Sequence, residues 1–192
     1  MVEFSMMQPQ ATPQEQDYPD LVPHKGVKYL FEKEIGTGAF GKVYLYRHPK
    51  DINDKVAIKI ERQGLGSSLI TNESYYTRIL NDDHHLDCVP KYHGDSFHNR
   101  RNYIIIEYID STIENYLKLP NIHPGKLSLV ELFHQMLRAL QSLHGTHHLH
   151  RDVKPDNFMI STLDNRVRLI DLGLLINFMP DGVHRQRGRY TF

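Results

Sequence analysis

The chain has 192 residues, of which 40% are hydrophobic and 24% charged, and its formal net charge at pH 7 is +0. This length fits about one domain with a sizeable core. The even charge balance argues against a strongly basic nucleic-acid binder or a polybasic membrane module. The single Cys88 cannot form an internal disulfide, and the sequence contains no apolar run of about 18 residues and no signal-peptide pattern. We therefore expect an intracellular protein, cytoplasmic or nuclear, without nucleic-acid or membrane partners.

The N-terminal segment differs in composition from the rest. Residues 1 to about 22 are rich in Gln and Pro and show neither a helical nor a strand period. We predict a disordered leader over residues 1–27 and a folded domain over residues 28–192. From Lys28 the pattern becomes β-rich, with a glycine loop and a polar turn between the predicted strands. These first strands are predicted at residues 29–31, 43–46 and 56–60.

The elements that follow change from mixed to helical. A helix is predicted over Ser68–Leu80, and short strands near residues 91–93 and 103–107. Two Ser-x-x-Glu patterns, beginning at Ser111 and Ser128, are typical of capping boxes that open helices. The second predicted helix, Ser128–His144, carries a broad apolar face. The sequence thus predicts an α+β fold, with a β-rich lobe up to about Ile109 and a helical lobe after it.

The glycine loop runs Gly36-Thr37-Gly38-Ala39-Phe40-Gly41. Glycines at this spacing let backbone N–H groups approach phosphate oxygens, although a plain turn explains the loop equally well by itself. A dinucleotide-binding fold would need the loop to open a helix. Here the residues after the loop continue as a strand, which favours a β-hairpin flap over a nucleotide.

Lys59 and Glu73 form the second candidate feature. Lys59 lies in the apolar strand Val56-Ala57-Ile58-Lys59, where a buried lysine needs an anionic partner. Glu73 shares a helix face with Ile70, Tyr76 and Leu80, so it needs a partner as well. We predict that the two side chains pair. The alternatives are a lysine that reaches water from the strand end and a solvated glutamate.

The third feature is the polar run His150-Arg151-Asp152-Val153-Lys154-Pro155-Asp156-Asn157. Asp152 can accept a proton from an attacking hydroxyl, Asn157 can coordinate a metal ion, and Lys154 can neutralise a phosphoryl group. Asp171-Leu172-Gly173 follows a predicted strand at residues 167–170 and is typical of a metal ligand in a mobile turn.

Together these motifs resemble the signature set of eukaryotic-type protein serine/threonine kinases in order and spacing. The resemblance covers residues 28 to about 190. Within kinases, the run HRDVKPDNFMI and the helix around Asn72-Glu73-Ser74 are most similar to the casein kinase one family. The resemblance implies a protein-kinase-like fold, ATP and Mg²⁺ as cofactors, and transfer of the γ-phosphate to Ser or Thr of proteins.

The resemblance also implies a role for each motif residue. Lys59 would contact the ATP phosphates and pair with Glu73, Asp152 would be the catalytic base, and Lys154 would support the γ-phosphate. Lys154 at this place points to Ser/Thr rather than Tyr acceptors. The implied Mg²⁺ ligands are Asn157 and Asp171. The implied nucleotide contacts are Ile35, Gly36, Thr37, Gly38, Ala39, Phe40, Gly41, Val43, Ala57, Lys59, Ile106, Glu107 and Ile109, with Glu107–Ile109 as the adenine hinge and Ile106 behind it.

Two departures from the kinase pattern stand out. Leu172 replaces the usual Phe, and we expect it to fill the same apolar pocket. Phe192 falls inside the activation segment, so we expect an incomplete helical lobe and a chain that alone is a poor catalyst of low stability. A pseudokinase-like binding or regulatory fragment is therefore the alternative function, and a small-molecule kinase a more distant one.

Two further hypotheses concern the histidines and the C-terminal arginines. His144, His147, His148 and His150 are close in sequence, but no cysteine completes a tetrahedral set, so structural zinc is disfavoured. By resemblance to the casein kinase one family, we expect acidic or phosphorylated residues upstream of the acceptor Ser/Thr. Part of the matching positive charge would come from Arg185, Arg187 and Arg189, for which a solvated basic loop is nearly as good an explanation.

Overall fold

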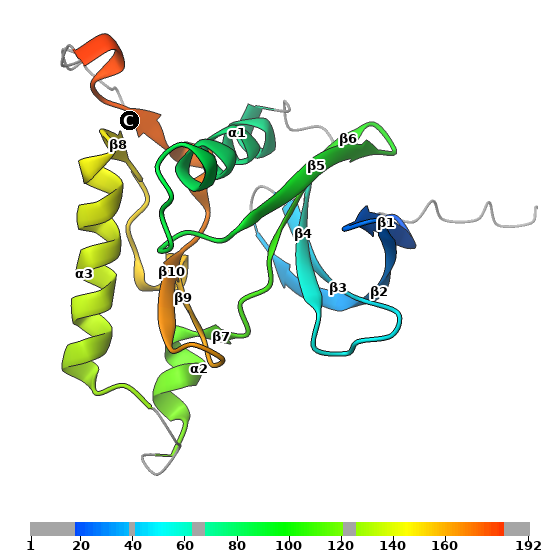
Figure 1. The fold of residues 1–192 in the computed structure, drawn as a ribbon, viewed down its shortest axis with the longest axis horizontal. Helices are drawn as coiled ribbons and strands as arrows, with labels where there is room; N and C mark the ends of the chain where they lie inside the picture. Colours follow the sequence, from blue (N-terminus) through cyan, green and yellow to red (C-terminus); the bar gives the residue numbers. More distant parts are fainter. Residues whose placement is uncertain (1–17, 39–40, 63–67, 121–125, 183–192) are drawn as a thin grey trace, which may run out of the picture.

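Two lobes follow one another along the chain in the computed structural model, which describes residues 18–38, 41–62, 68–120 and 126–182 (Figure 1). The N-terminal lobe contains β1 (Leu21–His24), β2 (Val27–Thr37), β3 (Gly41–Arg47), β4 (Lys55–Glu61), α1 (Ser68–Asp82), β5 (Tyr92–His98) and β6 (Arg101–Glu107). The C-terminal lobe contains β7 (Ser111–Thr112), α2 (Ile113–Lys118), α3 (Leu129–Gly145), β8 (His148–Leu149), β9 (Phe158–Ser161), β10 (Arg166–Leu169), β11 (Ile176–Asn177) and the 3-10 helices η1 (Pro155–Asn157), η2 (Leu172–Leu174) and η3 (Pro180–Gly182).

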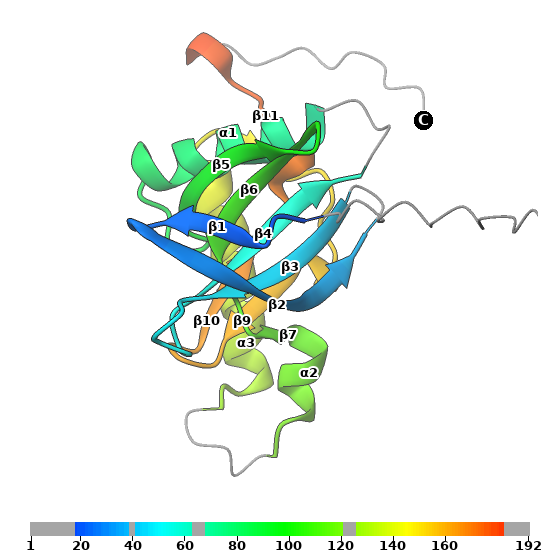
Figure 2. The same ribbon diagram turned by 90° about the vertical axis from the view of Figure 1, so that its right-hand side faces the viewer.

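The N-terminal lobe is built on one antiparallel sheet of six strands in the order β1-β2-β3-β4-β6-β5. Strand β4 lies between β3 and β6, and Lys59 sits opposite Val43 on one side and Ile104 on the other. The apolar composition of β4 follows from cover on both faces: Val56, Ile58 and Ile60 join the sheet core on one face, and on the other Lys59 contacts Glu73 of α1. Helix α1 packs against the β4, β5 and β6 part of the sheet (Figures 1 and 2).

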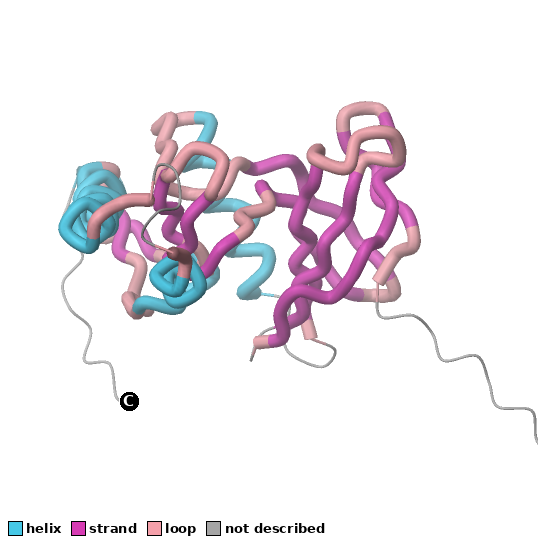
Figure 3. Tube along the Cα trace, turned by 90° about the horizontal axis from the view of Figure 1, so that it is seen from below, coloured by secondary structure: helices cyan, strands magenta, loops and turns pink. Residues whose placement is uncertain are grey.

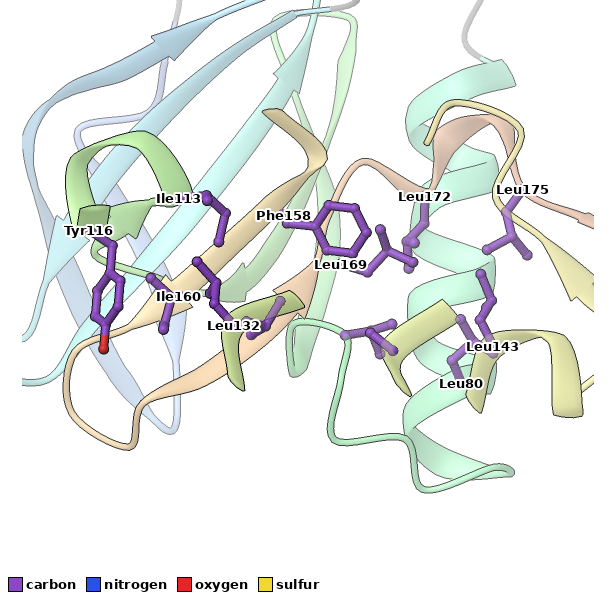
Figure 4. Close-up of a cluster of buried hydrophobic side chains, with 13 residues drawn as sticks. Leu80, Ile113, Tyr116, Leu132, Leu143, Phe158, Ile160, Leu169, Leu172 and Leu175 are labelled. Carbon is purple, nitrogen blue, oxygen red and sulfur yellow. The ribbon is translucent and has the colours of Figure 1, made fainter. Parts of the chain in front are cut away.

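Two apolar cores hold the lobes together. The first fills the sheet and contains Val22, Tyr29, Tyr44, Tyr46, Val56, Ile58, Ile60, Tyr103 and Ile105. The second runs from Ile113 and Tyr116 to Leu143, Leu172 and Leu175, and it includes Leu80 at the end of α1 (Figure 4). Each large side chain buried in this way contributes roughly 1.5–3 kcal/mol. Because Leu80 belongs to the second core, α1 is anchored to the C-terminal lobe as well as to the sheet.

The C-terminal lobe is less helical than predicted. Strands β10, β9 and β7 form a three-stranded sheet, and β11 pairs with β8. Figure 3 shows that the strands of the N-terminal sheet gather at one end of the molecule, while helical segments lie in the middle and at the other end. None of the described helices combines the length and the apolar character that crossing a bilayer requires. The predicted β-rich first lobe is confirmed, whereas the helical second lobe is interrupted by short strands.

The predicted leader is too long. Leu21–His24 is a strand that pairs antiparallel with β2, and the side chain of Val22 is fully buried. The ring of Tyr18 stacks on Phe31 with centroids 4.0 Å apart. The prediction of disorder is therefore wrong for residues 18–27, because Val22 helps to fill the sheet core. Residues 1–17 lie outside the described part.

One of the two predicted capping boxes is present. Ser128 Oγ accepts a hydrogen bond from the Glu131 N–H at 3.3 Å, and Glu131 Oε2 accepts from the Ser128 N–H at 2.8 Å. The box predicted at Ser111 is wrong. Ser111 pairs with Ile160 in the small sheet, and helix α2 begins one residue later, with Thr112 Oγ1 accepting from the next turn. Ser111 is therefore part of strand β7, and Thr112 caps α2 in its place.

Candidate functional site

Lys59 is the centre of the candidate site, where the two lobes meet. Its Nζ lies 2.6 Å from Glu73 Oε2 on α1 and 2.7 Å from Asp171 Oδ1, which directly precedes η2. The predicted pairing with Glu73 is present. The additional contact with Asp171 connects the sheet to the C-terminal lobe through a residue 112 positions away. One ammonium therefore fixes the relative position of a strand, a helix and a turn.

Burial makes this ion cluster strong. Glu73 is only 3% exposed, and Lys59 is largely covered as well. Burial alone would lower the pKa of Lys59, but the carboxylates of Glu73 and Asp171 outweigh it, so the pKa lies above its ordinary value. Burial likewise raises the pKa of Glu73, and the Lys59 ammonium acts against that shift. The lysine consequently stays charged at neutral pH.

Asp171 occupies an unusual backbone conformation. Its φ of 62° and ψ of 61° lie in the left-handed region, where non-glycine residues are rare and cluster at functional sites. The following Leu172 is buried in the C-terminal core, as predicted. Gly173 packs so close to α1 that a Cβ there would lie 3.3 Å from the Leu69 carbonyl oxygen. A side chain at Gly173 would therefore crowd the Leu69 backbone of α1, while the residue before it fills the apolar core.

Asp152 is held by two side chains of its own loop. Lys154 Nζ donates to Asp152 Oδ2 at 2.7 Å, and Asn157 Nδ2 donates to the same oxygen at 2.9 Å and to the Asp152 carbonyl at 2.7 Å. The Lys154 hydrogen bond, followed by that from Asn157, lowers the pKa of Asp152. The carboxylate is therefore ionised at neutral pH and can accept a hydrogen bond from a hydroxyl group.

His150 fixes the start of this loop. It is almost fully buried, and its Nε2 lies 2.8 Å from the Ile170 carbonyl oxygen, while the Asp152 N–H donates to Nδ1 at 3.4 Å. These two contacts assign the ring proton to Nε2, because Nδ1 acts as acceptor. Since Ile170 directly precedes Asp171, the imidazole joins the loop of Asp152 to the turn of Asp171.

The residues proposed to contact a nucleotide share one face of the sheet. Val43 lies opposite Gly36 and Lys59, and Ala57 lies opposite Ile106. Directly paired residues of antiparallel strands project to the same side, so these side chains face the side of Lys59. The remaining predicted contacts flank this face or end it: Ile35, Thr37, Gly38 and Gly41 around the loop, and Glu107 and Ile109 at the lobe junction. Ala39 and Phe40 lie outside the described residues.

Gly41 is the loop glycine with the clearest steric reason. A Cβ at this position would lie 2.1 Å from the Ile60 carbonyl oxygen, a distance that side chains do not tolerate. The Gly38 N–H donates to the Gly41 carbonyl oxygen at 2.9 Å and closes the hairpin. The loop therefore returns directly into β3, as the hairpin-flap interpretation predicted.

Glu107 at the predicted hinge has partners that the sequence did not reveal. Its carboxylate lies 3.4 Å from Arg168 on β10 and accepts from the Lys91 N–H at 3.2 Å, while its own N–H donates to the Lys91 carbonyl at 2.9 Å. The side chain of Glu107 is thus occupied by the protein. The available signal for this contact was Arg168, a charged residue between the apolar Val167 and Leu169 and buried in β10.

Asn157 and Asp171 suit a magnesium ion by their chemistry. Mg²⁺ prefers carboxylate and amide oxygens. The amide nitrogen of Asn157 is used in the hydrogen bonds to Asp152, which leaves its Oδ1 as the metal-binding atom. Within the described ranges, no group of three or more His, Cys, Asp or Glu residues could hold a metal ion, which includes the histidines around His147.

Sequence comparison decides the family. A sequence profile described as "Protein kinase domain" matches residues 29–191. The chain belongs to the protein kinase domain family. The protein named "Probable serine/threonine-protein kinase MARK-A" from Dictyostelium discoideum is 32% identical to this kinase domain over 157 residues. The match covers 79% of the chain but only 14% of that relative, so the chain spans about a seventh of its length.

The kinase family accounts for the expected β-rich first lobe, while the casein kinase one assignment and the individual residue roles remain predictions. The structure brings Lys59, Glu73 and Asp171 together, and it separately brings Asp152, Lys154 and Asn157 together. Besides Arg168, sequence reasoning missed the role of Asn72, which contacts the turn after Asp171. Its position directly before Glu73 was the only available signal.

Proposed function

We propose that this kinase domain transfers the γ-phosphate of Mg·ATP to Ser or Thr residues of protein substrates. The observation that carries the proposal is the buried Lys59, paired with Glu73 and Asp171 at 2.6 and 2.7 Å. A charged lysine between two lobes, beside a glycine loop and a metal-type carboxylate, suits the recognition of a polyphosphate. The name of the relative from Dictyostelium, a serine/threonine kinase, points the same way.

In this proposal each side chain has one task. Lys59 binds the phosphates, and Glu73 keeps its ammonium in place. Asn157 and Asp171 would hold Mg²⁺ through their oxygens. Bound Mg²⁺ supplies positive charge that neutralises the phosphate oxygens. The apolar side chains of Val43, Ala57 and Ile106 supply a surface for adenine, with the backbone of residues 107–109 as its hydrogen-bonding edge.

Asp152 orients the acceptor hydroxyl in this scheme. Its lowered pKa keeps it ionised, so it accepts the hydrogen bond of the attacking Ser or Thr and then its proton. Lys154 donates to Asp152 and is half-exposed, which leaves its ammonium near a transferring phosphoryl group. Phosphoryl transfer needs this positioning and charge neutralisation more than it needs a strong base.

For the substrate class, we propose Ser/Thr sites with acidic or phosphorylated residues upstream, from the resemblance to the casein kinase one family. The arginines invoked for this preference, Arg185, Arg187 and Arg189, lie outside the described residues. A positional peptide library tests the preference directly. Enrichment of acidic residues before the acceptor supports it, and a basic or proline-directed preference rejects the subfamily while leaving the kinase function intact.

The function itself is tested with γ-labelled ATP and peptides that contain Ser, Thr or Tyr as the single acceptor. We expect Mg²⁺-dependent label on Ser and Thr. Label on Tyr alone contradicts the acceptor class. A calorimetric titration beside it separates the alternative function: binding of Mg·ATP without any transfer identifies a regulatory, pseudokinase-like domain.

A further inference from the structure

Asn72 makes a contact between α1 and the Asp171 turn that none of the proposed roles uses. Its Nδ2 donates to the Gly173 carbonyl oxygen at 2.6 Å and lies 3.3 Å from the Leu175 carbonyl oxygen. Both acceptors belong to the end of η2, the short helix that begins directly after Asp171. Helix ends leave carbonyl groups without intrahelical partners, so a side-chain amide placed here stabilises the turn.

Glu73, the next residue of α1, contacts the same turn. Its carboxylate accepts a hydrogen bond from the Leu172 N–H in addition to the Lys59 ammonium. Neighbouring residues of one helix therefore hold two nearby peptide groups of the turn: Asn72 as donor to the Gly173 carbonyl and Glu73 as acceptor from the Leu172 N–H. Gly173 allows the close approach, because a Cβ there would lie 3.3 Å from the Leu69 carbonyl oxygen.

These contacts close a ring. Lys59 binds Glu73, α1 joins Glu73 to Asn72, and Asn72 binds Gly173. The backbone then leads from Gly173 to Asp171, which returns to Lys59 at 2.7 Å. In such a ring, the direction of the Asp171 carboxylate depends on the position of α1. Leu172 and Leu175, which lie beside α1 in Figure 4, add apolar contacts to the same junction.

We propose that Asn72 is a positioning residue for magnesium nucleotide binding: it clasps the Asp171 turn to α1 and so keeps Asp171 directed toward the site. This inference rests on the proposed function for its ligand, but the clasp itself is a property of the protein alone. Without the amide donor, the left-handed conformation at Asp171 loses one of its supports. The binding-competent turn is then populated for a smaller fraction of time, which weakens the apparent affinity by that fraction.

The first test needs no nucleotide. Amide hydrogen exchange of the 192-residue chain is compared between wild type and Asn72→Ala, with Asn72→Asp as a second variant that keeps the shape but presents an acceptor to two carbonyls. Faster exchange confined to residues 171–175 and the first turns of α1 supports the clasp. Unchanged exchange in this segment, or a uniform increase that includes β9 and β10, overturns it. Asn115→Asp, on the exposed face of α2, is the matched control.

The second test separates positioning from general stability. Calorimetry measures the affinity for Mg·ATP and for adenosine, which has no phosphate and needs no metal. We expect about tenfold weaker Mg·ATP binding in both Asn72 variants, the effect of one hydrogen bond, with adenosine affinity unchanged. Equal loss for both ligands overturns the positioning role. If wild type fails to bind Mg·ATP, the proposed function fails, and the exchange experiment still decides whether the clasp exists.

Discussion

Replacing Lys59 by Met tests whether the buried ion cluster stabilises the domain as well as binding phosphate. The change keeps an unbranched apolar side chain, shorter by one atom, but removes the ammonium partner of Asp171 and of Glu73, a residue only 3% exposed. Breaking a buried pair from one side typically costs about 3–5 kcal/mol. In a domain of this size about 2–4 °C of melting temperature corresponds to each kcal/mol, so we expect Tm to fall by about 6–20 °C.

A matched control lies on the same strand. Lys55 pairs with Glu32 at 3.4 Å at the surface, where such pairs contribute about 0–1 kcal/mol. Lys55→Met should therefore lower Tm by at most about 4 °C. The double variant Lys59→Met/Glu73→Leu should regain much of the stability lost by Lys59→Met, because the uncompensated carboxylate is gone.

The pH dependence of Lys59→Met gives a further check with a definite sign. Burial raises the pKa of Glu73, and in wild type the Lys59 ammonium opposes this rise. In Lys59→Met that opposing charge is absent. The penalty for the charged carboxylate is full above its folded pKa and absent below its unfolded pKa of about 4.5. The stability deficit of the variant should therefore narrow as pH falls toward 4.5. A variant that melts like wild type, with the same pH dependence, refutes the reasoning about the buried cluster.

Three further changes follow from the same structure. Lys154→Met removes the main hydrogen bond that lowers the Asp152 pKa, so the acid limb of the kcat/KM profile should move to higher pH; an unmoved limb contradicts this assignment. Burial lowers the pKa of His93 to about 4, so protonation of His93 opposes folding as pH drops from about 6.5 toward 4. Between pH 7 and 5, His93→Phe should therefore lose less free energy of unfolding than wild type in urea titrations. Phe133 on α3 is 55% exposed, so Phe133→Ser should reduce self-association in light scattering and leave Tm nearly unchanged, whereas Leu132→Ser in the core should lower it.

The parts of the site that could be predicted from sequence are those where burial leaves a local pattern. Lys59 inside an apolar strand and Glu73 on an apolar helix stripe both indicate buried charges. Two buried charges of opposite sign predict an ion pair, which is present. The loop around Asp152 is similarly readable, because its residues hydrogen-bond to one another within a few positions. The hairpin flap followed from strand residues directly after the glycines.

The parts that could not be predicted depend on pairing between distant segments. Strand β1 could not be predicted because Val22 is its only apolar residue in the sheet core, His24 being its other buried residue, while the residues before it have a disordered composition. Ser111 carries a capping signal, but it pairs with Ile160 of strand β9, 49 residues later in the chain. Arg168 pairs with nearby Asp164 at 2.9 Å, but it also contacts Glu107 across the lobe junction, as Asn72 contacts the Gly173 carbonyl. Nothing in their immediate neighbours specifies these distant partners.

The most direct test of the central claim is a single-turnover measurement of phosphate transfer from Mg·ATP to a Ser/Thr peptide, comparing wild type with Asp152→Asn. A positioned base typically contributes about 10²–10⁴-fold to the rate. We predict a loss in this range for Asp152→Asn, with Mg·ATP affinity preserved. A loss of less than about tenfold at unchanged nucleotide affinity contradicts the account, because another group must then accept the proton of the attacking hydroxyl.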